Sequence, residues 1–143
     1  MQRLLRKFET AKQLVPKPLE RKASKATRFG VLYYGSTSPA MDEALDRLDE
    51  QGLHVDAMRV RAFPFHESII DFIAAHDHVF VVEQNRDAQL RTLLMVEGAV
   101  EAAKLMPVLH YDGTPITARF IVAEASQRLS AFNVKPIKKD KAA

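Results

Sequence analysis

The most informative part of this chain for its fold class is Val79-Phe80-Val81-Val82-Glu83-Gln84-Asn85-Arg86-Asp87. Its continuous apolar half is typical of a strand that is buried on both faces of a parallel sheet. Its polar half is longer than a turn requires, and a helical pattern follows from Ala88 to about Ala103. The stretch therefore predicts a strand, a polar loop and a helix, which together form the repeating unit of a layered α/β domain.

The same unit recurs before and after this stretch. Apolar or alternating runs predict further strands, and each is followed by a helical pattern: strands at 29–34, 54–61 and 106–110, and helices at 38–52, 66–75 and 117–130. Ser38 and Pro39 are expected to open the first of these helices as its cap and first-turn proline. Four repeats with right-handed crossovers predict a three-layer α/β/α domain over residues 28–132, with a mostly parallel sheet of four or five strands.

The N-terminal 27 residues form a separate segment. Residues 2–14 place apolar side chains at helical spacing opposite basic ones, and Pro16 and Pro18 end this amphipathic helix. We expect its apolar stripe to pack on a neighbouring domain, and attachment to a membrane surface is the alternative. Residues 19–27 are polar and basic, which suits a linker or an edge strand. The basic tail at 133–143 is expected to be disordered.

Charge is distributed unevenly along the 143 residues. The whole chain carries +3, but residues 1–28 hold nine Lys or Arg against two Glu, whereas residues 29–133 hold 8 basic and 15 acidic residues. A nucleic-acid binder would place its basic residues on a folded face, so we expect no nucleic-acid partner. The chain has no Cys, which excludes disulfides, thiolate metal sites and a cysteine nucleophile. No membrane span and no signal peptide are expected, and a cytoplasmic location is the default.

Function is expected in the loops at the carboxyl ends of the parallel strands, where ligands and partners meet such sheets. We expect no catalytic residue and no metal ligand in this chain. Ser36, Thr37 and Ser38 could hold an anion at a helix N-terminus, although an ordinary capped turn is favoured. The remaining candidates are the other polar residues in or next to these loops: Arg61, Glu83, Gln84, Asn85, Arg86, Asp87, Gln89, Arg91, His110 and Asp112.

Some of these residues, and one further run, have two possible roles. Glu83 could be a general base, but an ion pair with Arg86 or Arg61 is favoured. Ser36 with His110 and Asp112 would make a hydrolytic triad, which is disfavoured because the second glycine of a nucleophile elbow is missing. The run His76-Asp77-His78 has a spacing that could bind a metal ion, but a solvated turn at the amino-terminal edge of the sheet is favoured.

Four runs together resemble a known family. They lie, in order, at 34–37 (YGST), 59–65 (RVRAFPF), 81–91 (VVEQNRDAQLR) and 108–118 (VLHYDGTPITA). In order and spacing they are similar to the C-terminal part of the alpha subunit of 2-oxoacid:ferredoxin oxidoreductases, most of all the 2-oxoglutarate type. The resemblance covers essentially residues 1–130, including the helix and the proline-containing linker.

The resemblance implies a fold like the transketolase C-terminal domain. It implies the strand order second, first, third, fourth, with an additional antiparallel edge strand falling at 19–26. It also implies a parent enzyme that uses thiamine diphosphate, magnesium, an iron–sulfur cluster and coenzyme A, and that passes electrons to ferredoxin. The thiamine diphosphate motif and the cluster cysteines are missing from this sequence.

The chain therefore resembles an isolated domain, either a natural short protein or a fragment, that is inactive alone. The resemblance implies a role in assembly with other domains of the alpha subunit and with the beta subunit, in which the polar candidates of the carboxyl-end loops would support the interface. Ferredoxin would be an indirect partner, and a homodimer is an option. The alternative is a stand-alone α/β protein that binds a small anion or nucleotide.

Overall fold

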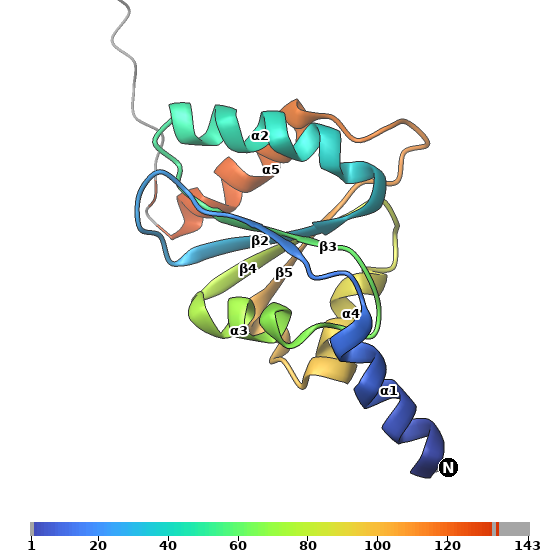
Figure 1. The fold of residues 1–143 in the computed structure, drawn as a ribbon. Coiled ribbons are helices and arrows are strands. Elements are labelled where there is room, and N and C mark those ends of the chain that lie inside the picture. Colours follow the sequence, from blue (N-terminus) through green and yellow to red (C-terminus); the bar gives the residue numbers. More distant parts are fainter. Residues whose placement is uncertain (1, 133, 135–143) are drawn as a thin grey trace, which may run out of the picture.

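The computed structural model describes residues 2–132 and 134, and its centre is a five-stranded sheet (Figure 1). The order across the sheet is β1-β3-β2-β4-β5, in which β1 is antiparallel to β3 and all other neighbours are parallel. The expected order and the antiparallel edge strand are therefore confirmed. The strands are β1 (Leu19–Arg21), β2 (Phe29–Tyr34), β3 (Asp56–Val60), β4 (His78–Glu83) and β5 (Leu105–Leu109).

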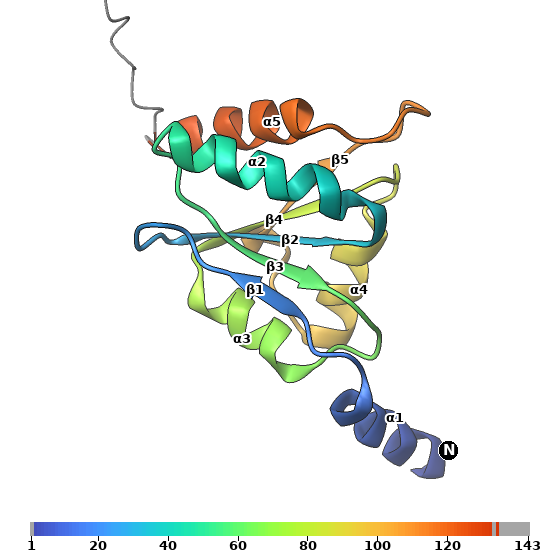
Figure 2. The ribbon, with the colours of Figure 1, turned by 45° about the horizontal axis from the view of Figure 1, so that its top comes forward.

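Helices cover both faces of the sheet and complete the expected three layers. In Figures 1 and 2, α2 and α5 lie on one face, and α3 and α4 lie on the other. Two short 3-10 turns, η1 and η2, precede α2 and β5. The bounds are α1 (Gln2–Leu14), η1 (Gly35–Thr37), α2 (Ser38–Glu50), α3 (Glu67–Ala75), α4 (Gln89–Gly98), η2 (Ala102–Lys104) and α5 (Ala118–Ala131).

Each face of the sheet buries its own apolar core. One core holds Phe80 and Val82 of β4 against residues of α2 and α5, and the other holds Val79 and Val81 against residues of α3 and α4. Alternate side chains of β4 thus enter opposite cores, as the pleat of a strand requires. The continuous apolar run is therefore buried on both faces, as expected.

Several details of the elements differ from the sequence prediction. The expected strand at 54–61 begins only at Asp56. The helix expected to reach Ala103 ends at Gly98, because Ala99 adopts a left-handed φ of 50°. Ser38 is not a cap but the first residue of α2, and its hydroxyl donates to the Gly35 carbonyl at 2.9 Å. Gly35, at a φ of 59°, lets the chain leave β2 and enter the 3-10 turn directly.

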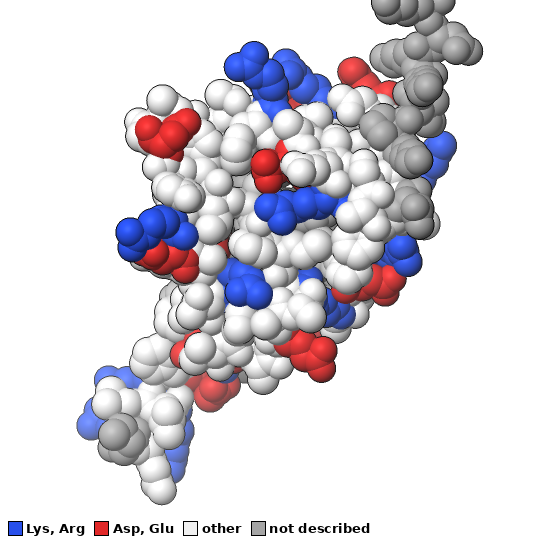
Figure 3. Space-filling model, turned by 180° about the vertical axis from the view of Figure 1, so that it is seen from behind, with Lys and Arg blue, Asp and Glu red and all other residues white. Residues whose placement is uncertain are grey.

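The amphipathic α1 stands away from the body of the molecule in both ribbon views (Figures 1 and 2). None of its residues is buried. The space-filling view in Figure 3 shows Lys and Arg side chains along this projecting helix. The expected disordered tail lies outside the described residues, apart from Val134. Over the residues that the structure describes, no helix is long and apolar enough to cross a membrane.

Candidate functional site

The carboxyl ends of β2, β3, β4 and β5 bring four loops to one edge of the sheet, which we call the carboxyl edge: 35–38, 61–65, 84–88 and 110–115. The chain leaves β2 toward β3 and leaves β4 toward β5, so the neighbouring strands β2 and β4 form the point where the winding reverses. Open α/β sheets place ligands and partners at this point. The predicted loops are therefore brought together.

Glu83 lies beneath the carboxyl edge rather than on it. Its side chain is fully buried, and its two carboxylate oxygens accept hydrogen bonds from the amides of Leu90 at 2.7 Å and Arg91 at 3.0 Å. These amides belong to the first turn of α4, where the helix has free donors and a positive end. Glu83 thus caps α4 from outside the helix. The ion pair favoured for Glu83 is absent, because its buried carboxylate pairs with no Lys or Arg side chain among the described residues.

Asn85 extends this internal bonding through the loop after β4. Its side-chain amide donates to Glu83 at 2.8 Å, while its carbonyl oxygen accepts from the backbone amides of Asp87 and Gln89 at 3.1 and 3.2 Å. Ala88 adopts a left-handed φ of 49° at the start of α4. Glu83 and Asn85 together therefore hold the loop and the first turn of α4 in one conformation.

Gln84 connects three loops of the carboxyl edge. Its amide nitrogen donates to the hydroxyls of Ser36 and Thr37 at 3.0 and 3.3 Å, and its oxygen accepts from the Ile116 amide at 3.3 Å. Thr37 and Ser38 are buried, so of the three candidate anion-binding hydroxyls only that of Ser36 lies at the surface. The disfavoured hydrolytic triad gains no support, because no hydrogen bond joins Ser36 to His110 among the described residues.

The two arginines of this region behave differently. Arg91 turns inward and donates to the carbonyls of Leu105 at 2.7 Å and Ala102 at 2.9 Å, which fastens α4 to the segment before β5. Arg86 points into solvent with 74% of its side chain exposed, and it pairs with the exposed Asp87 at 2.8 Å. Arg86 and Asp87 are therefore surface groups, whereas Arg91 is part of the scaffold.

His110 and Asp112 close the carboxyl edge on the β5 side. His110 is buried, its ring stacks edge-on against Phe120, and its Nε2 lies 3.5 Å from Asp112. The Thr114 hydroxyl and amide donate to the Asp112 carboxylate at 2.7 and 2.8 Å. These bonds hold the pKa of Asp112 below its usual range. Asp112 thus orders its own turn and remains exposed.

An apolar pocket of about 420 Å³ opens beside these loops. Tyr34 ends β2 at its rim, Phe63 and Phe65 come from the loop after β3, and Leu90 and Leu93 come from α4. Arg61 also lines it and has no ion-pair partner among the described residues. The loop at 61–65 could be predicted from the sequence, but the pocket was not predicted. The closely spaced aromatic residues after a strand were the sequence signal that could have indicated it.

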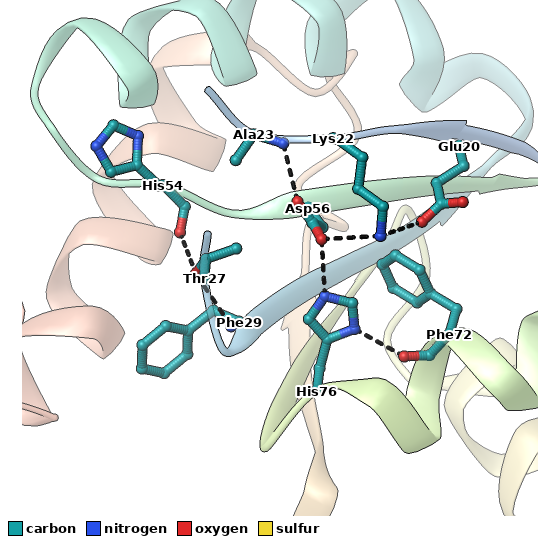
Figure 4. A network of polar contacts seen from close by, with 9 residues as sticks. All are labelled: Glu20, Lys22, Ala23, Thr27, Phe29, His54, Asp56, Phe72 and His76. Atoms are coloured by element: carbon teal, nitrogen blue, oxygen red, sulfur yellow. Dashed lines mark hydrogen bonds and ion pairs between the residues drawn. The ribbon is translucent and has the colours of Figure 1, made fainter. Parts of the chain in front are cut away.

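A buried polar network at the opposite edge of the sheet was not predicted from the sequence (Figure 4). His76 is 3% exposed, and its ring nitrogens lie 2.7 Å from the Phe72 carbonyl and 3.2 Å from the Asp56 carboxylate. The solvated turn expected at 76–78 is therefore wrong for His76. Asp56 also accepts from Lys22 at 3.1 Å and from the Ala23 amide at 2.8 Å.

This network fixes the charge of Asp56. Burial would raise the pKa of Asp56, but the hydrogen bonds from Ala23, Lys22 and His76 outweigh burial, so the pKa lies below its usual range. The network joins the segment after β1 to β3 and to the end of α3. Its central pair, Asp56 and His76, is buried and makes no polar contact outside the fold, so we assign the network a structural role. No group of three or more His, Asp or Glu side chains that could hold a metal occurs among the described residues.

Comparisons with known proteins place this fold. One similar solved structure is a 2-oxoglutarate:ferredoxin oxidoreductase from Magnetococcus marinus with 2-oxoglutarate, coenzyme A and succinyl-CoA bound; its TM-score is 0.75, with 24% identity over 85% of this chain. Another is the alpha chain of a probable 2-oxoacid ferredoxin oxidoreductase from Thermoplasma acidophilum, with a TM-score of 0.53 and 21% identity over 80% of this chain. This chain spans 21% of the first protein chain and 97% of the second.

No protein-family model matches the sequence, and the search among curated proteins returns no match. At 24% and 21% identity, the likeness to solved structures establishes the fold. The chain therefore shares the three-layer α/β/α fold of a domain found in two 2-oxoacid:ferredoxin oxidoreductases.

Proposed function

We propose that this chain is a non-catalytic assembly domain of a thiamine-diphosphate-dependent 2-oxoacid:ferredoxin oxidoreductase, of the 2-oxoglutarate type. The observation that carries the proposal is the inward bonding of the polar residues after β4. The polar side-chain atoms of Glu83, Gln84 and Asn85 form hydrogen bonds with one another, with neighbouring loops and with α4. They form a rigid, preassembled edge, which suits docking better than chemistry.

The candidate residues divide into two groups on this proposal. Buried or inward-facing groups position the edge: Glu83, Gln84, Asn85, Arg91 and His110. Exposed groups meet another domain of the alpha subunit or the beta subunit: Arg61, Arg86, Asp87, Gln89 and Asp112. Exposed charged groups at such an edge set the orientation and rate of association more than its strength.

The cofactors of the parent enzyme bind elsewhere on this proposal. The carboxyl edge has no group of metal-ligating side chains among the residues described, and the side chains of Glu83 and Asn85 are already hydrogen-bonded. Thiamine diphosphate, magnesium, the iron–sulfur cluster and coenzyme A would be held by other parts of the enzyme. Ferredoxin would be reached only through those parts.

Association with the remaining subunits tests the proposal. We expect the wild-type chain to bind them in analytical ultracentrifugation, and Arg86→Glu to weaken binding at least about tenfold, since a rim charge is reversed. Arg47→Glu is the matched control, because Arg47 is an exposed arginine in the last turn of α2. Absence of binding by the wild type, or equal binding by Arg86→Glu, would contradict the proposal.

The apolar pocket favours a second candidate, a small-ligand-binding protein. Its volume falls within the range of ligand sites, and Arg61 offers a cation at its rim. Thermal shift measurements with coenzyme A, thiamine diphosphate and inorganic phosphate separate the two candidates. Saturable stabilisation by one compound supports the binding protein, and no shift with any of them supports the assembly domain.

A further inference from the structure

The helix α1 has an apolar face that nothing in the described chain covers. Leu4, Leu5, Phe8 and Leu14 are 57%, 62%, 50% and 79% exposed, and Phe8 reaches Phe63 only edge-on, at 6.4 Å between ring centroids. A helix of this length is marginal in water and depends on packing of its apolar face. The exposed face therefore marks an interaction surface.

A groove of about 500 Å³ lies next to this helix, between α1 and α3. Phe65 and Ile70 provide apolar surface, and carboxylates from α1, α3 and α4 line it beside one cation, Lys12, which pairs with Glu9 at 2.8 Å. Glu67 and Asp71, one turn apart on α3, have no Lys or Arg partner among the described residues. The groove is therefore acidic and partly apolar.

The exposed helix is the complement of this groove. Arg3 and Lys7 lie one turn apart on α1, like Glu67 and Asp71 on α3, and neither has an acidic partner within the described part of the chain. Leu4 belongs to the exposed apolar stripe of the same helix, and Ile70 offers apolar surface in the groove. We propose that the occupant of the groove is a second copy of this chain, so that α1 of each copy packs against the groove of the other.

Symmetry and charge both favour this occupant. A surface that carries a basic apolar helix beside an acidic apolar groove is self-complementary, which is what a two-fold dimer requires. An anionic membrane would attract Arg3 and Lys7 but would be repelled by the carboxylates of the groove beside them. The dimer goes beyond the proposed function, because it forms from this chain alone.

The oligomeric state in solution tests the dimer. Light scattering coupled to size-exclusion chromatography should show a concentration-dependent dimer of the wild-type chain. Leu4→Asn combined with Phe8→Asn should raise the dissociation constant at least about thirtyfold, as expected for central apolar contacts. Tyr111→Asn is the control, since it removes an exposed aromatic side chain from the loop after β5.

A charge swap makes the test specific to the proposed pairing. Arg3→Glu with Lys7→Glu in one variant, and Glu67→Lys with Asp71→Lys in another, should each abolish the homodimer, while circular dichroism shows both folded. An equimolar mixture of the two variants should dimerise again, because the altered helix then meets the altered groove and the unaltered helix meets the unaltered groove, in both cases with opposite charge. A wild-type chain that stays monomeric up to about 1 mM would overturn the dimer. So would a dimer indifferent to these variants, or a mixture that stays monomeric.

Discussion

Replacing the buried Glu83 by glutamine should destabilise the chain strongly while changing its volume very little. Glu83 accepts three hydrogen bonds, from the Leu90 and Arg91 amides and from the Asn85 side chain. In Glu83→Gln the oxygen can still serve Leu90 and Asn85, but the new amide nitrogen then faces the N–H of Arg91. One donor is left without an acceptor, and the negative charge at the start of α4 is lost.

The expected magnitude follows from these losses. A hydrogen bond to a charged group contributes about 1.5–3 kcal/mol, and an unsatisfied buried N–H costs about 1–3 kcal/mol. Because these two quantities overlap, we expect about 3 kcal/mol. With an unfolding entropy of about 0.3 kcal/mol/K for a chain of this size, the midpoint of thermal unfolding should fall by about 10 °C.

Urea denaturation with an unchanged m value measures this loss. Glu97→Gln is the matched control: Glu97 is exposed near the end of the same helix, and its replacement should change stability by less than about 0.5 kcal/mol. Hydrogen exchange should show faster exchange at Leu90 and Arg91 in Glu83→Gln. A loss no greater than that of Glu97→Gln, with normal protection of these amides, would refute the assigned capping role.

Three further predictions test the rest of the scaffold. Asp56→Asn should reduce the loss of unfolding free energy as pH falls. The lowered folded-state pKa of Asp56 stabilises the wild type above the unfolded pKa of about 3.9, and this stabilisation is lost as pH falls through the folded pKa. Urea titrations between pH 2 and 7 check this, and equal acid slopes of wild type and variant would count against it. Gln84→Ala should cost about 1–2 kcal/mol and speed exchange of the Ile116 amide, whereas unaltered exchange would mean that Gln84 does not join the loops. Gly30→Ala should be destabilising by more than about 1 kcal/mol, because its Cβ would lie 2.8 Å from the ring of Phe72; a calorimetric midpoint equal to that of the wild type would contradict this packing.

Much of the fold could be predicted from the sequence because its signals are local. The apolar run at 79–82, the prolines after α1 and the Thr117 cap, whose hydroxyl accepts from the Phe120 amide, each act within a few residues. The boundaries that were missed depend on single backbone conformations. Ala99 ends α4 in the left-handed region, although nothing in an alanine side chain predicts that conformation.

The candidate site shows the same division. The polar loop after β4 was found because five polar residues follow a buried strand. The direction in which each side chain points could not be predicted, because it depends on partners far along the chain. Gln84 meets Ser36 across 48 positions, and His76 meets Asp56 across 20.

The order of elements, the two-sided burial of β4 and the location of the polar edge could all be predicted from the amino-acid pattern. These follow from hydrophobic period and composition, which folding must satisfy in any arrangement. Three features emerge only in the folded chain: Glu83 caps α4, Arg91 faces inward while Arg86 faces solvent, and α1 stands uncovered beside an acidic groove. The physical reason is that burial and hydrogen bonding in a packed sheet depend on which distant segments lie side by side.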